Sequence, residues 1–324
     1  MGTSRILITT IFLHPGDAVD QRLRAEGFET VFKPLHQTRT EDELIALLKG
    51  VDGAIVSVDP FTARVLGASP QLKVISRTGV GYDAIDVPAA TTRGVVVCTT
   101  PGVNRHAVAE WAFALMLCCS RKMTENLTEV RKGGWNRSEG VDLAGKTLGI
   151  VGLGTIGKEL AQRAAAFEMR ILATDVVQDL QFAEAHRVIF VPLEELLRES
   201  DFVSLHLFLN AKSRHVINAE RLALMKPTAF LINTSRGGVV DTAALIQALT
   251  EKRIGGAALD VFEGEPLASD SPLRALDNVY LSPHCAGATS DARRLSGWTA
   301  AENLIRALKK ERPLSVVNPE VLER

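Results

Sequence analysis

A glycine-rich motif near the middle of the chain has the spacing of a dinucleotide phosphate site. The apolar run 148–151 leads into Gly-Leu-Gly-Thr-Ile-Gly at 152–157, and Asp175 follows at the end of the next predicted strand. In a G-x-G-x-x-G turn the glycines permit a tight bend, a close approach of the backbone to a pyrophosphate, and close packing of the following helix. The pyrophosphate would lie at the N-terminus of that helix. The expected cofactor contacts here are Gly152, Gly154, Thr155, Ile156 and Gly157.

The sequence around this motif favours a nucleotide site over an ordinary glycine-rich turn. An Ala-rich helix is predicted over Lys158–Phe167, and the strand Arg170–Ala173 then leads to Asp175. An acid at this place accepts hydrogen bonds from the ribose 2′-hydroxyl of NAD and repels the 2′-phosphate of NADP. No basic residue occupies position 176 or 177, so the sequence predicts NAD as the cofactor.

A second set of residues suited to chemistry follows three predicted strands. Arg236 comes after Phe230–Asn233, Glu263 and Glu265 come after Ala257–Asp260, and His284 comes after Val279–Leu281. Ligands bind at the carboxyl ends of strands in open α/β sheets, so these side chains are expected to converge. Singly, the arginine could cap a helix and the histidine and acids could be ordinary loop residues, as we expect Glu263 to be. Their shared position favours an active site.

The three residue types suit one reaction class. A histidine can donate a proton to a carbonyl oxygen near neutral pH. A carboxylate beside it favours the charged imidazolium. A planar guanidinium binds a carboxylate bidentately and orients the neighbouring carbonyl. Together they predict the reduction of a 2-oxo acid by a hydride from the bound cofactor.

Four motifs in this order make the chain resemble the NAD-dependent D-isomer-specific 2-hydroxyacid dehydrogenases. They are GLGTIG with Asp175, INTSRGGVVD at 232–241, ALDVFEGEP at 258–266 and SPHCAG at 282–287. The family includes D-3-phosphoglycerate, D-lactate, glyoxylate and hydroxypyruvate reducing enzymes, and the resemblance covers essentially the whole chain. It implies hydride transfer between NAD(H) and a small 2-hydroxy or 2-oxo acid of the D series.

The resemblance also implies a role for each site residue. Arg236 matches the arginine that binds the substrate carboxylate, Glu265 the acid that pairs with the histidine, and His284 the general acid/base. Asp260 matches the residue that holds the nicotinamide carboxamide, and His206 one near the nicotinamide ribose. Thr234 and Gly287 complete the expected cofactor contacts. The expected substrate contacts are the backbone amides of Val80 and Gly81 together with Arg77 and Arg236.

Two departures from the family pattern bear on the substrate. Many phosphoglycerate-oxidising members carry an arginine where this chain has Ser57, although Arg77 is kept at the other phosphate-associated place. A non-phosphorylated acid is therefore expected, unless another cation replaces the missing one; the alternatives are Arg105, Arg131, Arg137 or a residue of a partner subunit.

Phe208 stands where the family usually has proline. Glu265 argues against a formate dehydrogenase, which has glutamine there, and the end of the chain at Arg324 leaves no room for the regulatory domain of some phosphoglycerate members.

Alternating strands and helices must position these residues. Strands are predicted at Arg5–Thr10, Glu29–Phe32, Gly53–Val56, Lys73–Ser76, Val95–Cys98, Gly149–Val151, Ile171–Ala173, Val188–Val191, Phe202–Leu205, Phe230–Asn233, Ala257–Asp260 and Val279–Leu281, and Leu314–Val317 is a further candidate. Such alternation implies an α/β fold with parallel sheets. The resemblance divides it into two doubly wound, Rossmann-like domains with a cleft between them. Residues 1–98 with 290–324 would form the substrate domain and residues 99–289 the dinucleotide-binding domain.

Two segments of this plan leave alternatives open. The glycine-rich stretch Thr78–Asp83 could present backbone N–H groups to an anion or form a plain strand-to-helix turn. The predicted helix Ala107–Lys122 is apolar nearly all round, so it must be buried either within the fold or against another subunit. Its apolar side chains exceed what one flank of a domain usually covers, which predicts a homodimer formed through this helix.

Composition limits the remaining possibilities. The net charge of −1 gives no basic excess for nucleic acid or an anionic membrane surface, and no apolar run reaches the length of a spanning helix. The four cysteines have no metal-ligand spacing, which predicts a reduced, cytoplasmic chain without a metal, and Cys285 is expected to be a packing residue rather than a reactive thiol. An NAD-sensing scaffold or corepressor that keeps the dehydrogenase fold is the alternative function. The sequence does not identify the acid that is reduced.

Overall fold

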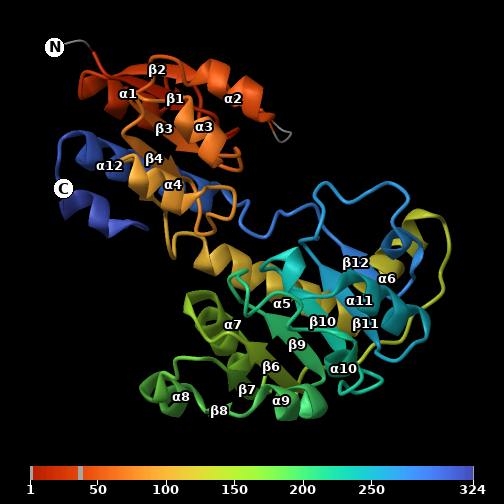
Figure 1. The fold of residues 1–324 in the computed structure, drawn as a ribbon. Helices are drawn as coiled ribbons and strands as arrows, with labels where there is room; N and C mark the ends of the chain where they lie inside the picture. The colour runs from red at the N-terminus through yellow and green to blue at the C-terminus, as the bar shows by residue number, and fades with distance from the viewer. Residues whose placement is uncertain (1–2, 36–38, 324) are drawn as a thin grey trace. The chain divides into compact units, whose positions relative to one another are not determined.

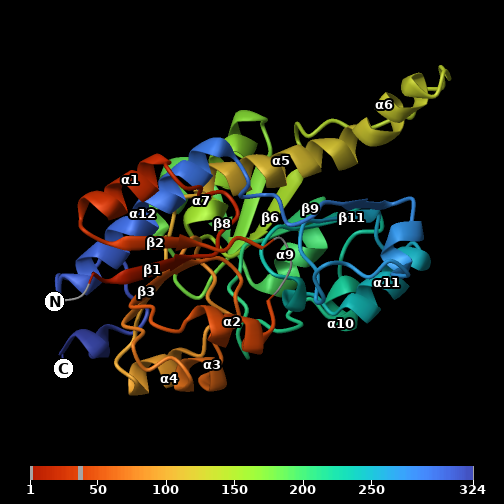
Figure 2. The same cartoon turned by 90° about the horizontal axis from the view of Figure 1, so that it is seen from above.

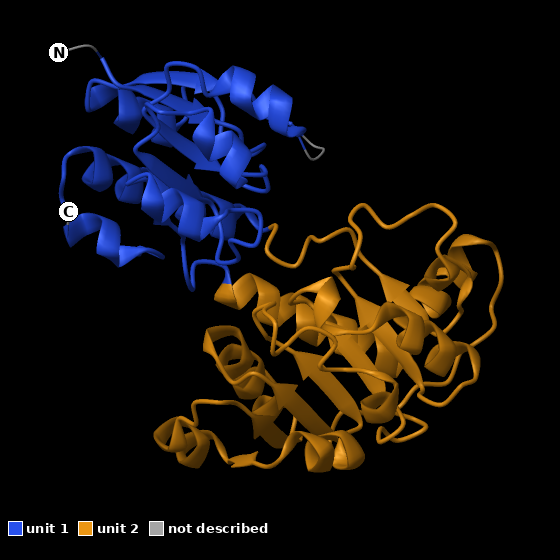
Figure 3. Cartoon of the chain, in the orientation of Figure 1, with its two compact units in different colours: residues 1–104, 289–324 blue, residues 105–288 orange. Residues whose placement is uncertain are grey.

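The computed structural model describes residues 3–35 and 39–323, and the chain forms two compact units (Figures 1 and 3). Unit 1 comprises residues 1–104 and 289–324, and unit 2 comprises residues 105–288. Each unit contains one parallel sheet covered by helices on both faces. The predicted fold class, two doubly wound α/β domains, is confirmed.

Unit 1 is built on a five-stranded sheet in the order β2-β1-β3-β4-β5. The strands are β1 (Arg5–Ile8), β2 (Glu29–Phe32), β3 (Gly53–Val56), β4 (Val74–Arg77) and β5 (Val96–Cys98). Helices α1 (Ala18–Ala25) and α12 (Ser290–Leu308) cover one face, and α2 (Glu41–Leu47), α3 (Ala63–Gly67) and α4 (Val87–Thr92) cover the other (Figure 2). Burial on both faces explains the continuous apolar strands that the sequence shows.

Unit 2 is built on a seven-stranded sheet in the order β12-β11-β10-β9-β6-β7-β8. The strands are β6 (Thr147–Val151), β7 (Arg170–Thr174), β8 (Val188–Phe190), β9 (Phe202–Leu205), β10 (Phe230–Asn233), β11 (Gly256–Leu259) and β12 (Val279–Leu281). Helices α5 (Arg105–Arg121), α7 (Thr155–Ala166) and α8 (Leu180–His186) cover one face, and α9 (Leu193–Glu199), α10 (Ala219–Leu222) and α11 (Thr242–Thr250) the other. The strand order reverses between β6 and β9, which is where such sheets bind dinucleotides.

Much of the long apolar helix α5 is buried inside unit 2. Met116 is 0% exposed, and Phe113 and Leu115 are also buried in the core beside α7. Small residues such as Ala109 and Ala112 on this helix are fully buried against the same core, where α7 contributes small residues of its own. Trp111 and Leu117 on the same helix are only partly buried, so the predicted dimer contact through α5 stays a prediction.

A helix that the sequence analysis did not predict follows α5. The left-handed backbone of Lys122 (φ 46°) separates α5 from α6 (Met123–Arg131), and α6 extends away from the sheet of unit 2 (Figure 2). Met123, Leu127 and Val130 are exposed on it at the spacing i, i+4, i+7, so they share one face. Strongly exposed apolar side chains therefore lie on α6.

Two further predictions concern the segment 314–317 and membrane-spanning helices. The segment 314–317 is not a strand: Val316 makes one isolated antiparallel bridge to Cys98, and Val317 N–H donates to the oxygen of Val97 at 2.8 Å. Within residues 3–35 and 39–323, no helix has the length and apolarity required to cross a membrane.

Candidate active site

The glycine motif forms the turn between β6 and α7. Gly152 has φ 98°, and a Cβ atom there would lie 2.6 Å from the backbone oxygen of His206. A Cβ at Gly157 would lie 2.3 Å from the oxygen of Gly152, so both positions require glycine. Gly154 is the N-cap of α7 and supplies no side-chain cap, which leaves the first N–H groups of this helix and its positive dipole end for an anion. This geometry fits a pyrophosphate.

Two buried polar atoms near this turn lack a hydrogen-bond partner that a bound ligand could supply. His206 Nδ1 and Thr234 Oγ1 have no hydrogen-bond partner among the described residues, although an unsatisfied buried polar atom is costly. They follow the adjacent strands β9 and β10. Burial lowers the pKa of His206 to about 4, so its imidazole is neutral at physiological pH, with Nε2 2.9 Å from Ser204 Oγ. The hydroxyl and amide groups of a nicotinamide dinucleotide would satisfy both atoms.

The end of β7 offers an acid to a ribose. Asp175 Oδ1 accepts a hydrogen bond from the backbone N–H of Val177 at 3.2 Å, and its second oxygen accepts none from the described residues. Val176 and Val177 are strongly exposed. Lys158 on α7 binds Asp179, with 2.5 Å between Nζ and Oδ2, so the positive charge of this lysine is already matched. The arrangement favours a ribose hydroxyl over an additional phosphate at this place.

Asp260 holds the loop that carries His284. This carboxylate is 0% exposed and accepts hydrogen bonds from Ser282 Oγ at 2.5 Å, Cys285 N–H at 2.9 Å and Ala286 N–H at 2.8 Å. Ser282 Oγ in turn accepts a hydrogen bond from Trp111 Nε1 on α5 at 3.2 Å. The sequence assigned Asp260 to the cofactor alone, whereas most of its bonding capacity serves this loop. A contact to the nicotinamide carboxamide stays a prediction.

His284 and Glu265 form an ion pair at this edge of the sheet. His284 Nδ1 lies 2.7 Å from Glu265 Oε2, and Glu265 Oε1 accepts a hydrogen bond from Phe262 N–H at 3.0 Å. Burial opposes ionisation of Glu265, but the bonds and positive charge of His284, the N–H of Phe262 and the charge of Arg236 outweigh it and lower the pKa of this carboxyl. The carboxylate form of Glu265 is therefore stabilised beside His284 Nδ1.

Arg236 lies on a turn that Asn233 organises. Asn233 is buried at the end of β10; its Nδ2 donates to the oxygen of Arg236 at 2.9 Å, and its Oδ1 accepts from Ser235 N–H at 3.0 Å. The Arg236 Nη1 donates to the oxygen of Ser235 at 2.7 Å, and its charge contributes to the low pKa of Glu265. The structure thus brings Arg236, Glu265 and His284 to the ends of three neighbouring strands. Sequence reasoning missed Asn233, whose amide side chain after a strand was the available signal.

The predicted carboxylate loop belongs to unit 1. It follows β4, and the backbone N–H groups of Val80 and Gly81 donate to no acceptor within the described residues. Arg77 Nε donates to the oxygen of Ser57 at 3.1 Å. A Cβ at Gly79 would lie 1.8 Å from Arg77 Nη1, so the guanidinium passes directly over this glycine. The loop has amide donors to offer, and Arg77 is already held against its own backbone.

Cys285 lies beside Asp260 and is not activated. Burial and the neighbouring negative charge of Asp260 raise the pKa of the thiol, which keeps it protonated. In the described part of the chain, no group of three or more His, Cys, Asp or Glu side chains has an arrangement suited to a metal ion.

Comparison with known proteins gives one consistent result. Residues 113–286 match the family model of the D-isomer specific 2-hydroxyacid dehydrogenase NAD-binding domain. A glyoxylate reductase of Korarchaeum cryptofilum is 46% identical over 86% of this chain and 86% of its own length. A D-3-phosphoglycerate dehydrogenase of Methanocaldococcus jannaschii is 41% identical over 86% of this chain and 54% of its own. The structure of an NADPH-dependent glyoxylate/hydroxypyruvate reductase of Sinorhizobium meliloti with NADP and malonate superposes with a TM-score of 0.85 at 32% identity, covering 98% of this chain and 97% of that one.

The acid at the end of β7 gives a prediction about cofactor choice. We expect a lower Kd for NADH than for NADPH, because Asp175 repels the 2′-phosphate. Asp175→Ala should lower the ratio of the Kd for NADPH to the Kd for NADH about tenfold. Fluorescence titration of the purified protein with both cofactors measures this. Asp291→Ala, which removes an exposed acid of unit 1, is the control and should leave the ratio unchanged. Equal affinity for both cofactors in the native chain would contradict the assignment.

Proposed function

The chain belongs to the D-isomer specific 2-hydroxyacid dehydrogenase family and is an NAD(P)-dependent oxidoreductase of 2-hydroxy and 2-oxo acids; we propose that it reduces small, non-phosphorylated 2-oxo acids such as glyoxylate and hydroxypyruvate. The observation that carries the proposal is the 2.7 Å pair of His284 and Glu265, with Arg236 close enough to stabilise the carboxylate. A proton donor and a carboxylate-binding group at one sheet edge are what this reaction requires.

Each residue has a distinct part in the proposed reaction. When bound, NADH supplies the hydride. Arg236 binds the substrate carboxylate and fixes the direction of the adjacent carbonyl. His284 donates a proton from Nε2 to the carbonyl oxygen, because Nδ1 is engaged by Glu265. Glu265 keeps the imidazole protonated and oriented until the proton is transferred.

The choice of a non-phosphorylated acid rests on the substrate unit. Binding of a substrate phosphate group would require several cationic hydrogen-bond donors. Ser57 stands where a second arginine is expected, and Arg77 is bound to the Ser57 oxygen. Of the alternative cations, Arg105 is bound to Glu159, with 3.2 Å between Nε and Oε1. The glyoxylate reductase at 46% identity supports the same choice.

We further propose that the enzyme works as a homodimer in the cytoplasm. All four cysteines are free, which suits a reducing compartment. The exposed face of α6 is the proposed dimer contact: Leu127 is 59% and Val130 56% exposed, and Trp135 in the following segment is 77% exposed. Apolar side chains grouped in this way indicate a protein interface.

The His284–Glu265 pair predicts a defined pH dependence. His284→Asn should preserve NADH binding and lower kcat for reduction by about 10²–10⁴, the usual contribution of a general acid. In the native enzyme, reduction should fall as pH rises and His284 loses its proton. Glu265→Gln should move that fall to lower pH, because the imidazolium loses its carboxylate. Steady-state kinetics across pH measure both effects, and an unchanged profile in Glu265→Gln would remove Glu265 from this role.

Substrate preference is tested by side-by-side kinetics. We expect kcat/KM with NADH to be higher for glyoxylate or hydroxypyruvate than for phosphohydroxypyruvate, because too few cations are available for a phosphate. Pyruvate and branched 2-oxo acids complete the panel. A clear preference for the phosphorylated acid would show that another cation replaces the one missing at Ser57. Tight NADH binding without turnover of any acid would favour the scaffold alternative.

The dimer is tested through the exposed face of α6. Light scattering at micromolar concentration should give twice the mass of one chain. Leu127→Glu should raise the dimer Kd by at least about 10²-fold, because it buries a charge in an apolar contact. The control is Leu314→Glu in unit 1, a position of similar exposure at 57%, which should remain dimeric. A stable native monomer at this concentration would contradict the proposal.

A further inference from the structure

Glu263 is not the free loop acid that the sequence suggests. Its Oε1 lies 2.7 Å from His215 Nε2 and 3.7 Å from Arg214 Nη2. Its Oε2 accepts a hydrogen bond from the backbone N–H of Thr242, the first residue of α11, at 3.3 Å. The side chain is 29% exposed. Burial opposes its ionisation, but the bonds from Thr242 and His215 outweigh it and lower the pKa of Glu263. Glu263 is therefore a carboxylate bound to two other segments of unit 2.

These contacts tie together the segments that carry the site residues. His215 N–H donates to the oxygen of Gly238 at 2.9 Å, which attaches it to the turn after Arg236. A Cβ at Gly237 would lie 1.9 Å from the carbonyl carbon of Phe262, so the turn and the Glu263 segment are in direct backbone contact. Glu263 thus cross-links the His215 turn, the start of α11 and the segment 261–266.

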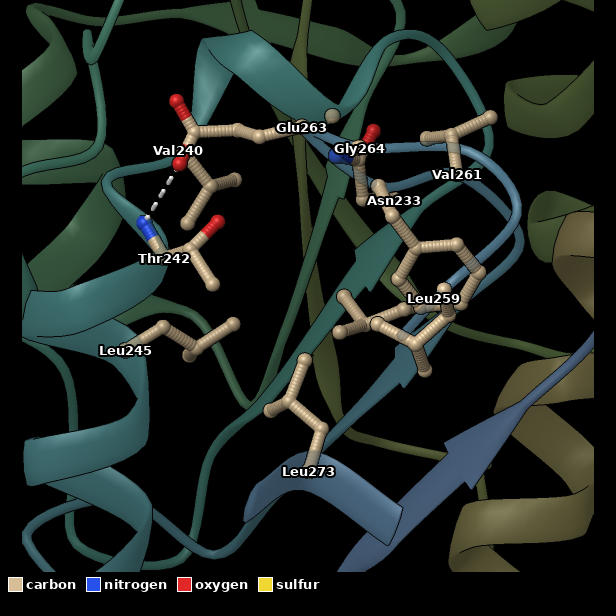
Figure 4. A pocket seen from close by; sticks show the side chains of 12 residues that line it. Asn233, Val240, Thr242, Leu245, Leu259, Val261, Glu263, Gly264 and Leu273 are labelled. Atoms are coloured by element: carbon tan, nitrogen blue, oxygen red, sulfur yellow. Dashed lines mark hydrogen bonds between the residues drawn. The ribbon is translucent and has the colours of Figure 1, made fainter. Parts of the chain in front are cut away.

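The segment 261–266 borders a pocket of unit 2. The pocket has a volume of about 110 Å³ and is lined mainly by apolar side chains, including Leu245, Leu259 and Leu273 (Figure 4). Figure 4 shows the Glu263 side chain passing over this space to the N–H of Thr242. The apolar side chains offer the segment no hydrogen bonds, so the polar bonds of Glu263 add a directional restraint to it.

The restrained segment ends in the acid of the ion pair. Glu265 lies two residues after Glu263, and its Oε1 is bound to the N–H of Phe262, the residue before Glu263. A shift of the Phe262–Glu263 backbone would move the carboxylate that lies 2.7 Å from His284. Arg214 and His215 face Glu263, and Arg236 and His284 face Glu265.

We propose that Glu263 and His215 form a positioning clamp that holds Glu265 against His284 and so sustains protonation of the proposed general acid. The clamp rests on the proposed function of the His284–Glu265 pair. Glu263 and His215 act through Glu265, and substrate binding is left to other residues. Their loss should therefore change kcat and its pH dependence more than KM.

Glu263→Ala is the direct test, measured as NADH-dependent reduction of glyoxylate or hydroxypyruvate across pH. We expect kcat to fall about tenfold, a fraction of the general-acid contribution, with KM changed less than about twofold and the Kd of NADH unchanged. The loss of rate at high pH should move to lower pH, because a loosened carboxylate stabilises the imidazolium less. Glu263→Gln, which keeps an oxygen for the N–H of Thr242, should recover part of the rate.

A double-mutant cycle separates the clamp from a merely structural role. If Glu263 acts through Glu265, then Glu263→Ala should lower kcat by less than about twofold in the Glu265→Gln background. The control is Glu194→Ala, which breaks a comparable ion pair to Arg221 (3.0 Å) at the start of α9 and should leave the pH profile unchanged. Multiplicative effects of the two substitutions, or an unshifted profile in Glu263→Ala, would overturn the clamp.

A second variant covers the case in which Glu263→Ala does not fold. His215 has a left-handed backbone (φ 50°), which asparagine tolerates, so His215→Asn shortens the side chain without backbone strain. It should shift the pH profile in the same direction, and folding is checked by thermal unfolding. If Glu265→Gln shifts the profile and both clamp variants do not, the clamp alone is wrong. If the native enzyme reduces no 2-oxo acid, the proposed function fails first.

Discussion

The buried carboxylate of Asp260 determines where His284 can be. A charge without exposure to water is tolerated only where donors surround it, and Asp260 receives them from Ser282, Cys285 and Ala286. These bonds draw the loop after β12 back over the end of β11, its neighbour in the sheet. They also offset the cost of the left-handed backbone at His284 (φ 50°). The proposed proton donor is therefore placed by a residue of another strand and not by its own segment alone.

Glycines let the backbones of neighbouring strand ends approach closely enough to share one site. Gly152 contacts the backbone of His206, and Gly237 contacts that of Phe262; a Cβ atom at either would collide with main-chain atoms. The first contact joins the glycine turn after β6 to the partly buried, neutral His206. The second joins the Arg236 turn to the segment that ends in Glu265. The absence of a side chain thus permits close backbone contact both at the glycine turn after β6 and at the proposed acid–base site.

The sequence predicted what is encoded locally. The strands and the glycine turn depend on apolar runs and on glycine spacing, and β2, β3, β9, β10 and β12 have the predicted bounds. What it missed depends on tertiary contacts. The apolar pattern of α5 cannot show which side chains its own domain covers, and the structure shows that Phe113, Leu115 and Met116 are among them. The anchoring of Glu263 depends on His215, 48 residues away, and no local pattern indicates that pairing. The exposed stripe of α6 is visible only once the helix is known to extend from the unit.

Exposure of the His284–Glu265 pair explains why so much structure is devoted to its geometry. The side chains are 48% and 35% exposed, and an ion pair that contacts water is screened and individually weak. Its attraction alone would not keep two flexible side chains in one arrangement. Asp260 fixes the loop of His284, and Glu265 is held by the N–H of Phe262 in a segment anchored through Glu263. Folding of the backbone therefore orders the two side chains, which their mutual attraction alone could not do. This is the physical meaning of a preorganised proton donor.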